Sequence, residues 1–166
     1  MKNTSIKVID ILVVEDNSGD ARLIKEVLND NKVFSSFYLA KDGVEAMDFL
    51  HNRGNFKTVP KPDLIILDLN LPRKDGREVL AEIKNDEDLK HIPIVIMTIS
   101  QAEEDILKSY NLHANCFITK PIDLNQFIKV VKSIEDFWFS IVKLPPKNEN
   151  PIYAKEDQRT NEKETF

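Results

Sequence analysis

Carboxylate, hydroxyl and ammonium groups each follow directly after a short apolar run of this sequence. The residues concerned are Glu15, Asp16, Asp68, Thr98 and Lys120. If the runs are parallel strands, their carboxyl ends share one edge of a sheet, where open α/β folds bind ligands. Three carboxylates gathered there would repel one another unless a cation lay among them, and oxygen ligands favour Mg²⁺ over zinc. The pattern therefore predicts a magnesium site.

Asp68 is the candidate nucleophile of this group, because it ends the central apolar run. A carboxylate beside bound Mg²⁺ can attack a phosphoryl group and form an aspartyl phosphate. The ammonium of Lys120 would balance the developing charge, and the hydroxyl of Thr98 would donate to a phosphoryl oxygen. The residue types thus predict acceptance of a phosphoryl group.

The spacing of the apolar runs predicts the fold that positions these groups. Short runs rich in Val and Ile alternate with stretches of helical period, which favours a parallel sheet with helices on both faces. The right-handed crossover rule places helices on both sides of the sheet, which is consistent with an α/β, doubly wound, five-stranded parallel sheet of order 2-1-3-4-5. Strands are predicted at 8–14, 34–40, 64–67, 94–97 and 116–118, and helices from near Ser18, Gly43, Gly76 and Ala102, with a last helix over 124–142. N-caps are expected at Asn17 or Ser18, at Asp75 and at Asp123.

A single domain is expected from the length of 166 residues, of which 42% are hydrophobic. We place this domain at residues 1–144, because Pro145 and Pro146 stop the last helix. Residues 145–166 are polar and of mixed charge, which predicts a largely disordered tail.

The composition argues against several classes of function. The four glycines are too dispersed for a dinucleotide fingerprint or a phosphate-binding loop of the Walker type. A net charge of −5 without a basic run disfavours nucleic acid as a partner. No run approaches the roughly 18 apolar residues that span a membrane. The lone Cys116 allows no internal disulfide, which favours the cytoplasm.

These motifs resemble those of the receiver domains of two-component response regulators, which have a flavodoxin-like fold. The resemblance covers residues 6 to about 142. It rests on four elements in the same order, namely Glu15-Asp16, Asp68-Leu69-Asn70-Leu71-Pro72 with Asp75-Gly76, Thr98, and Lys120-Pro121. The segments Asn115 to Pro121 and Phe137 to Pro145 further resemble the single-domain regulators that are paired with phytochrome-type sensor kinases.

The resemblance implies a phosphorelay protein whose Asp68 accepts phosphate from a histidine kinase in a Mg²⁺-dependent reaction. It also implies that Asp16, Asp68 and the backbone carbonyl of Asn70 bind the metal directly, while Glu15 binds through water. The protein would be a signalling switch rather than a turnover enzyme, and a stand-alone receiver without a DNA-binding output domain.

The same resemblance implies how the switch would operate. Phosphate on Asp68 would draw Thr98 inward and vacate space for Phe117, which would change the surface formed by the fourth helix, fifth strand and fifth helix. An ordinary core role for Phe117 is the alternative. A cis peptide bond is implied before Pro121.

Two other functions stay open on the residues alone. A hydrolase of the haloacid dehalogenase type would use Asp-x-Asp, whereas this chain has Asp68-Leu69-Asn70, and an amide cannot serve as the general acid. A flavodoxin-like binding module or an unphosphorylated scaffold is the other alternative. The shortage of glycine and serine loops disfavours a flavin site.

Ile99 follows Thr98 at a position where receiver domains commonly carry a small residue. A stiff β-branched side chain there would act as an access gate over Asp68 and slow the in-line attack of water. The alternative is that Ile99 turns into the core beside Met97 and Ile96.

The end of the last predicted helix suggests a contact with a second copy of the chain. Three consecutive aromatic residues begin at Phe137, and they span too much of a helix surface for one core-facing stripe. The inward stripe is predicted as Phe127, Val131, Ile134, Trp138 and Ile141, and the second face as Val130, Phe137 and Leu144. We therefore expect a homodimer through the fourth helix, fifth strand and fifth helix, with Val130, Phe137 and Trp138 at the interface. A fold-back of either terminal segment over this face is the alternative.

Overall fold

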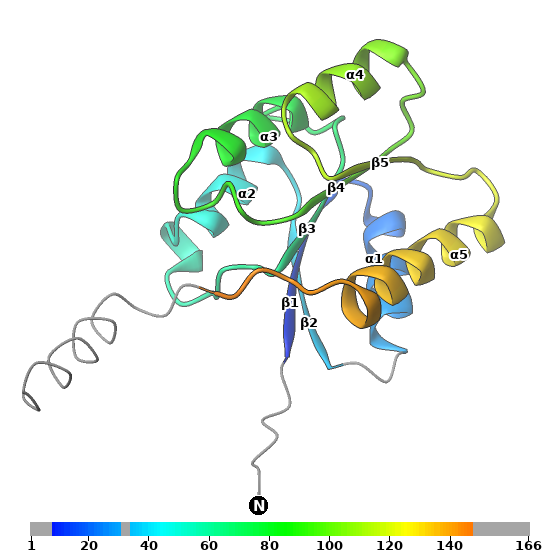
Figure 1. The fold of residues 1–166 in the computed structure, drawn as a ribbon, viewed down its shortest axis with the longest axis horizontal. Helices are drawn as coiled ribbons and strands as arrows, with labels where there is room; N and C mark the ends of the chain where they lie inside the picture. Colours follow the sequence, from blue (N-terminus) through cyan, green and yellow to red (C-terminus); the bar gives the residue numbers. More distant parts are fainter. Residues whose placement is uncertain (1–7, 31–33, 148–166) are drawn as a thin grey trace, which may run out of the picture.

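The computed structural model describes residues 8–30 and 34–147, and its centre is one parallel sheet of five strands (Figure 1). The strand order is β2-β1-β3-β4-β5, which confirms the predicted fold class. The strands are β1 Ile9–Val14, β2 Ser35–Ala40, β3 Leu64–Leu67, β4 Ile94–Thr98 and β5 Cys116–Thr119. Each predicted strand is present, and the observed ends differ from the predicted ones by one residue at most.

Five α-helices of the described residues connect and flank these strands. They are α1 Ser18–Asn29, α2 Gly43–Leu50, α3 Gly76–Asn85, α4 Glu103–Asn111 and α5 Leu124–Glu135, with a short 3-10 turn η1 at Gly54–Phe56. The side chains of Asn17, Asp75 and Asp123 accept hydrogen bonds from the free amides of α1, α3 and α5 and act as N-caps, as the sequence predicts. By contrast, the residue before α4 is Ala102, which offers no side-chain cap.

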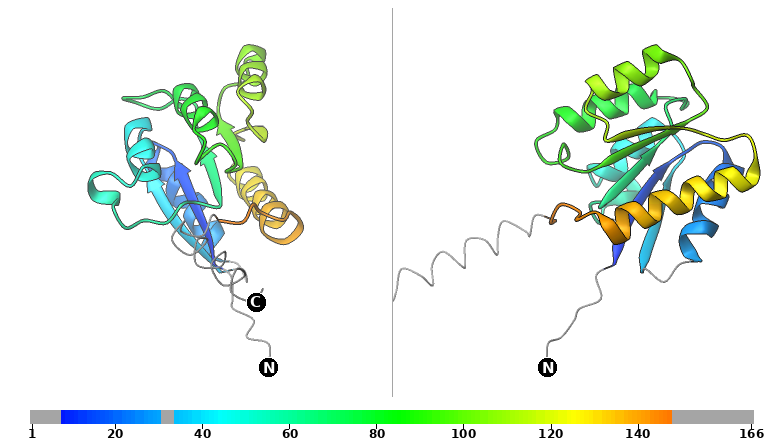
Figure 2. Two further views of the ribbon diagram at one scale, coloured as in Figure 1. Left: turned by 60° about the vertical axis from the view of Figure 1, so that its left-hand side comes forward. Right: turned by 45° about the vertical axis from the view of Figure 1, so that its right-hand side comes forward.

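Two apolar cores lie on the two faces of the sheet. Figure 2 shows α2, α3 and α4 on one face and α1 with α5 on the other. Alternation along β4 divides its side chains between them, since Ile94 and Ile96 join the α2–α3 core while Val95 and Met97 join the α1–α5 core. Both faces of the central strands are therefore buried, which explains their continuous apolar runs.

The end of the last helix differs from the prediction. After α5 the chain winds into a π-helical turn, η2, at Asp136–Ile141, in which the amide of Val142 donates to the carbonyl of Phe137 at 2.9 Å. This wider turn breaks the 3.6-residue period on which the predicted stripe rests. Ile141 is consequently 74% exposed, so its prediction as an inward residue is wrong.

The three residues predicted at the dimer interface lie in or near this region and differ in exposure. Phe137 is 48% exposed, as a residue on an outward face should be. Val130 and Trp138 are half-buried and pack against the α1–α5 core, and the ring of Trp138 meets that of Phe137 edge-on at 5.5 Å. Within this trio, Phe137 is the most exposed residue.

Residues 142–147 form a strap, drawn in orange, that crosses the lower part of the sheet in the view of Figure 1. The ammonium of Lys147 pairs with Asp10 and lies 3.4 Å from the Oδ2 atom of Asp63, whose side chain is fully buried. That oxygen also accepts the amide of Asp10 at 2.9 Å. Contacts with the sheet thus extend past the predicted domain boundary at 144, because a buried carboxylate provides an anchor for Lys147. The rest of the predicted tail lies outside the described residues.

No helix within the described residues is long and apolar enough to cross a membrane.

The strap generates a prediction about stability. Replacement of Lys147 by Met removes the ammonium that faces the buried Asp63 carboxylate, and should lower the free energy of unfolding in urea by about 1–2 kcal/mol. The effect is moderate because the lysine side chain is 37% exposed and solvent screens its pairing. Lys143→Met, which alters an exposed lysine of the same strap, should change the free energy by less than about 0.5 kcal/mol. Equal urea midpoints for the two variants would refute the anchoring role.

Candidate functional site

The register of the sheet brings the predicted site residues to one edge. Val14 pairs with both Ala40 and Leu67, so β1, β2 and β3 end at the same level. The amide of Asp68 donates to the carbonyl of Val14, and the amide of Lys120 donates to that of Thr98. These bonds extend the ladder one residue past each strand and hold the functional side chains where the strands end.

Lys120 is the centre of the site. Its side chain is 5% exposed, and its Nζ atom lies 2.5 Å from Glu15 Oε2, 3.1 Å from Asp68 Oδ2 and 3.0 Å from Asp20 Oδ2. Glu15 and Asp68 are themselves buried. A buried ammonium requires such partners, because an unpaired charge in this environment would cost several kcal/mol.

Asp20 belongs to this site although the sequence analysis missed it. It lies in the first turn of α1, where the N-cap Asn17 accepts its amide at 2.9 Å. The signal available in the sequence was an acidic residue in the first turn of a helix that begins directly after the acid pair. Favourable interaction with the helix dipole explains an acid there without any site, so the signal is not specific.

The carboxylates form a candidate metal centre. Oxygen atoms of Glu15, Asp16 and Asp68 lie within 4.8 Å of one another. They line an open pocket together with Asp20 and Lys120, so four carboxylates face one ammonium and the pocket has an excess of negative charge. Oxygen donors with excess negative charge suit a hard divalent cation. Asp16 is exposed, which leaves its carboxylate accessible to such an ion.

Burial shifts the protonation equilibria of the pair at the centre. Burial raises the pKa of Glu15 to about 7, although the hydrogen bond from Lys120 opposes this shift. Burial alone would lower the pKa of Lys120, but the hydrogen bond to Glu15 and the nearby charges raise it above its usual range. Lys120 is therefore a permanent cation at neutral pH.

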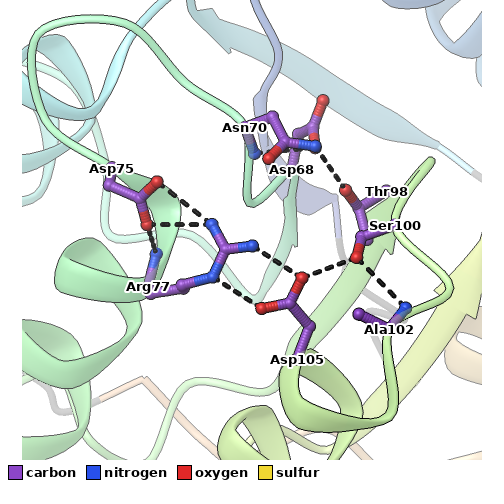
Figure 3. A network of polar contacts seen from close by, with 8 residues as sticks. All are labelled: Asp68, Asn70, Asp75, Arg77, Thr98, Ser100, Ala102 and Asp105. Carbon is purple, nitrogen blue, oxygen red and sulfur yellow. Dashed lines mark hydrogen bonds and ion pairs between the residues drawn. The ribbon is translucent and has the colours of Figure 1, made fainter.

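The turn after β3 connects Asp68 to Thr98. The amide of Asn70 donates to Asp68 Oδ1 at 3.1 Å, and the Asn70 side-chain amide donates to Thr98 Oγ1 at 3.4 Å (Figure 3). Thr98 is fully buried. A Cβ atom at Gly76 would lie 2.2 Å from the carbonyl oxygen of Asp68, so this turn can close only with glycine at that position.

Phe117 lies where a displacement of Thr98 could reach it. Phe117 pairs with Ile96 across β4 and β5, and it packs against the α2–α3 core to which Ile96 belongs. Thr98 lies two residues after Ile96 and so shares that face of the sheet. Phe117 is half-buried rather than enclosed, so it has contacts with this core and partial access to solvent.

Ile99 lies at the mouth of the pocket. Its side chain is 69% exposed and lines the pocket with Asp68 and Lys120. The alternative in which Ile99 turns into the core is thereby excluded.

The implied cis peptide bond before Pro121 is not found, since no cis peptide bond occurs among the described residues. The trans form is the intrinsically preferred isomer of an X–Pro bond by about 0.5–1 kcal/mol. Lys120 already reaches Glu15 and Asp68 with the bond in this form.

Comparison with known proteins agrees with this geometry. The family model of the response regulator receiver domain matches residues 11–132. The chain is 50% identical over 135 residues to the response regulator Rcp1 of Synechocystis sp., an alignment that covers 81% of this chain and 92% of that protein.

Solved structures show the same likeness. The Mn²⁺-bound form of Rcp1 has 48% identity and a TM-score of 0.81, covering 83% of this chain and 99% of that one. The phosphorylated cyanobacterial phytochrome response regulator RcpA has 50% identity and a TM-score of 0.82, covering 84% of this chain and all of that one. The chain described here therefore belongs to the family of response regulator receiver domains and is closely related to the phytochrome response regulators.

Proposed function

We propose that Asp68 is the residue of this receiver that accepts the phosphoryl group. The observation that carries the proposal is the contact of its buried carboxylate with the ammonium of Lys120 at 3.1 Å, inside a cluster of acidic side chains. Asp68 attacks phosphorus in line. The P–N bond of the phosphohistidine on the kinase breaks, and its electron pair leaves with the imidazole.

The other site residues support this transfer in distinct ways. Lys120 lies beside Asp68 Oδ2 and offsets the negative charge that the phosphoryl oxygens bring. Thr98 carries the hydroxyl that donates to a phosphoryl oxygen once the loop after β4 shifts. Phe117 then repacks on the same face of the sheet and transmits the change to α4, β5 and α5.

Mg²⁺ is the metal we propose for the acidic pocket. Asp16, Asp68 and the backbone carbonyl of Asn70 would bind it directly, with Glu15 acting through water, and the oxygen donor set supports this choice. When bound, the ion neutralises phosphoryl oxygens and helps to orient the group for attack.

The partner we propose is a sensor histidine kinase of the phytochrome type. The support is the 50% identity to the cyanobacterial phytochrome response regulator RcpA. The protein would act as a signalling switch rather than a turnover enzyme, because Asn70 stands where a hydrolase of the dehalogenase type needs a general acid. The lone Cys116 supports the cytoplasm as its compartment, without direct contact with nucleic acid or membrane.

Intact-mass measurement after incubation with acetyl phosphate and Mg²⁺ tests the acceptor. The wild-type protein should gain one phosphate, whereas Asp68→Asn should gain none, because an amide is not a competent nucleophile. Asp88→Asn changes an exposed carboxylate outside the acidic pocket and should leave phosphorylation unchanged. A phosphate gained by Asp68→Asn at the wild-type rate would overturn the assignment.

Ile99 gates the approach to Asp68 in this proposal. Its exposed β-branched side chain lines the pocket, where it restricts the in-line path of water and of small phosphodonors. Ile99→Ala should therefore lose phosphate faster and also react faster with acetyl phosphate. The expected change is on the order of tenfold, equivalent to about 1.4 kcal/mol of barrier.

The half-life of the aspartyl phosphate measures this effect. Ile122→Ala is the matched control, since Ile122 is fully exposed and does not line the pocket. Equal half-lives for wild type and Ile99→Ala would disprove the gate.

The second copy of the chain is the partner we propose for the surface of α4, β5 and α5. Leu107 and Tyr110 of α4 are 64% and 48% exposed, and Phe137 adds an exposed aromatic ring after α5. Val130 and Trp138 would contribute at the margin, because they are half-buried. Exposed apolar side chains of this size are typical of a surface that a partner covers.

Sedimentation at increasing protein concentration tests the dimer. Phe137→Asp should shift the equilibrium toward monomer, because it places a charge in the proposed contact. Phe34→Asp makes the same change at an exposed ring beside β2, on the opposite edge of the sheet, and should have no effect. A wild-type protein that stays monomeric at high concentration, with and without a phosphoryl analogue, would exclude this dimer.

A further inference from the structure

A polar network links the loop after Asp68 to the start of α4 (Figure 3). Arg77, in the first turn of α3, donates from Nε to Asp105 Oδ1 at 2.9 Å and from Nη2 to Asp105 Oδ2 at 2.7 Å. Its Nη1 atom also contacts both carboxylate oxygens of Asp75, at 3.2 and 3.1 Å. The guanidinium therefore bridges the N-cap of α3 and the first turn of α4.

The network continues toward Thr98. Ser100 Oγ donates to Asp105 Oδ2 at 2.5 Å, and it accepts the amide of Ala102 at 3.4 Å. Ser100 lies two residues after Thr98, in the loop that must shift when Thr98 approaches a phosphoryl group. A contact that fixes Ser100 consequently restrains Thr98.

Few buried side chains hold α4. Ser109 is the one residue of the helix that is fully buried and Ile106 is half-buried, while Leu107 and Tyr110 face solvent. Ala102 supplies no side-chain cap. In contrast, Val79, Leu80 and Ile83 fix α3 in the core, so Arg77 projects from a rigid helix toward a loosely attached one.

The ion pair of Arg77 and Asp105 is well suited to hold the first turn of α4 in place. The side chains of Arg77 and Asp105 are 23% and 18% exposed, so solvent screens them less than an open surface pair. A bidentate fork also fixes orientation as well as distance. The hydrogen bonds from Arg77 and Ser100 hold the pKa of Asp105 at about 2, so its carboxylate stays ionised near neutral pH.

We propose that Arg77 is a positioning residue that latches the first turn of α4, through Asp105 and Ser100, in the unphosphorylated arrangement of the switch. The inference deepens the proposed function, in which Asp68 accepts phosphate and Thr98 moves toward it. Because the latch opposes that movement, its loss lowers the free energy needed to reach the phosphorylated arrangement.

Hydrogen exchange of the unphosphorylated protein tests the latch without any phosphate chemistry. Arg77→Met and Asp105→Asn should each raise amide exchange in residues 99–111 by about tenfold, because the restraint on the loop and α4 is lost. Amide exchange in the double variant should be no faster than in either single variant, since both substitutions remove the same interaction. Asp105→Asn leaves the contact between Arg77 and Asp75 in place, and therefore tests the contact with α4 alone.

The rate of phosphorylation by acetyl phosphate and Mg²⁺ tests the effect on the switch. Both single variants should react about fivefold faster or more, which is the lower end of typical coupling between two sites. Arg77→Lys keeps the charge without the fork and should restore part of the wild-type rate. A merely structural role would instead lower the urea midpoint and leave the rate unchanged. Arg22→Met, which removes the exposed pair with Glu26 in α1, is the matched control for both measurements.

The outcomes separate this inference from the proposed function. Unchanged exchange in Arg77→Met and Asp105→Asn would overturn the latch. Raised exchange with an unchanged or slower phosphorylation rate would overturn its control of the switch. Phosphorylation of Asp68→Asn at the wild-type rate would overturn the proposed acceptor, whereas the exchange result would still decide whether the latch exists.

Discussion

The burial of the Lys120 ammonium is the constraint on which the site depends. A cation that is 5% exposed must have anions within hydrogen-bond distance, and Glu15, Asp20 and Asp68 supply them from two strand ends and one helix. These carboxylates outnumber the ammonium, so the pocket keeps a net negative charge at its open side. The same pairing that stabilises the lysine thus leaves an attraction for a divalent cation, and through it for a phosphoryl group.

That arrangement requires strand ends that stop at one level. Parallel pairing of β1 with β3 aligns Val14 with Leu67, and the close turn at Gly76 then sends the chain away from Asp68 without filling the pocket. Two apolar cores hold the central strands from both faces, which fixes the register because a slip by one residue would exchange the two faces. The positions of the site residues therefore derive from the sheet.

The fold and the placement of the polar residues directly after the strands could be predicted, because both follow from the local pattern of apolar and polar residues in the sequence. Apolar runs fix the strands, and polar residues directly after them fix the site. Asp20 and the Arg77 to Asp105 pair could not be predicted, because an acid in a first turn or a charge on a helix has an ordinary surface explanation. The π-helical turn at Asp136–Ile141 could not be predicted either, because the search for a period of 3.6 residues assumes an α-helix. The trans bond at Pro121 contradicts an inference from resemblance, not from residues.

The elements of the fold differ in how many buried apolar side chains anchor them, and such a difference suits a conformational switch. The three central strands β1, β3 and β4 and the helix α3 are anchored by buried apolar side chains, whereas α4 fully buries one serine, half-buries Ile106 and exposes Leu107 and Tyr110. An element with few apolar contacts can shift at small cost, and polar contacts to its end then determine where it rests. Since the exposed side chains of α4 also belong to the surface proposed for the second copy, a displacement of its first turn would alter that surface directly. If both proposals hold, the site and the partner surface are coupled through α4, which has the fewest buried residues of the five described α-helices.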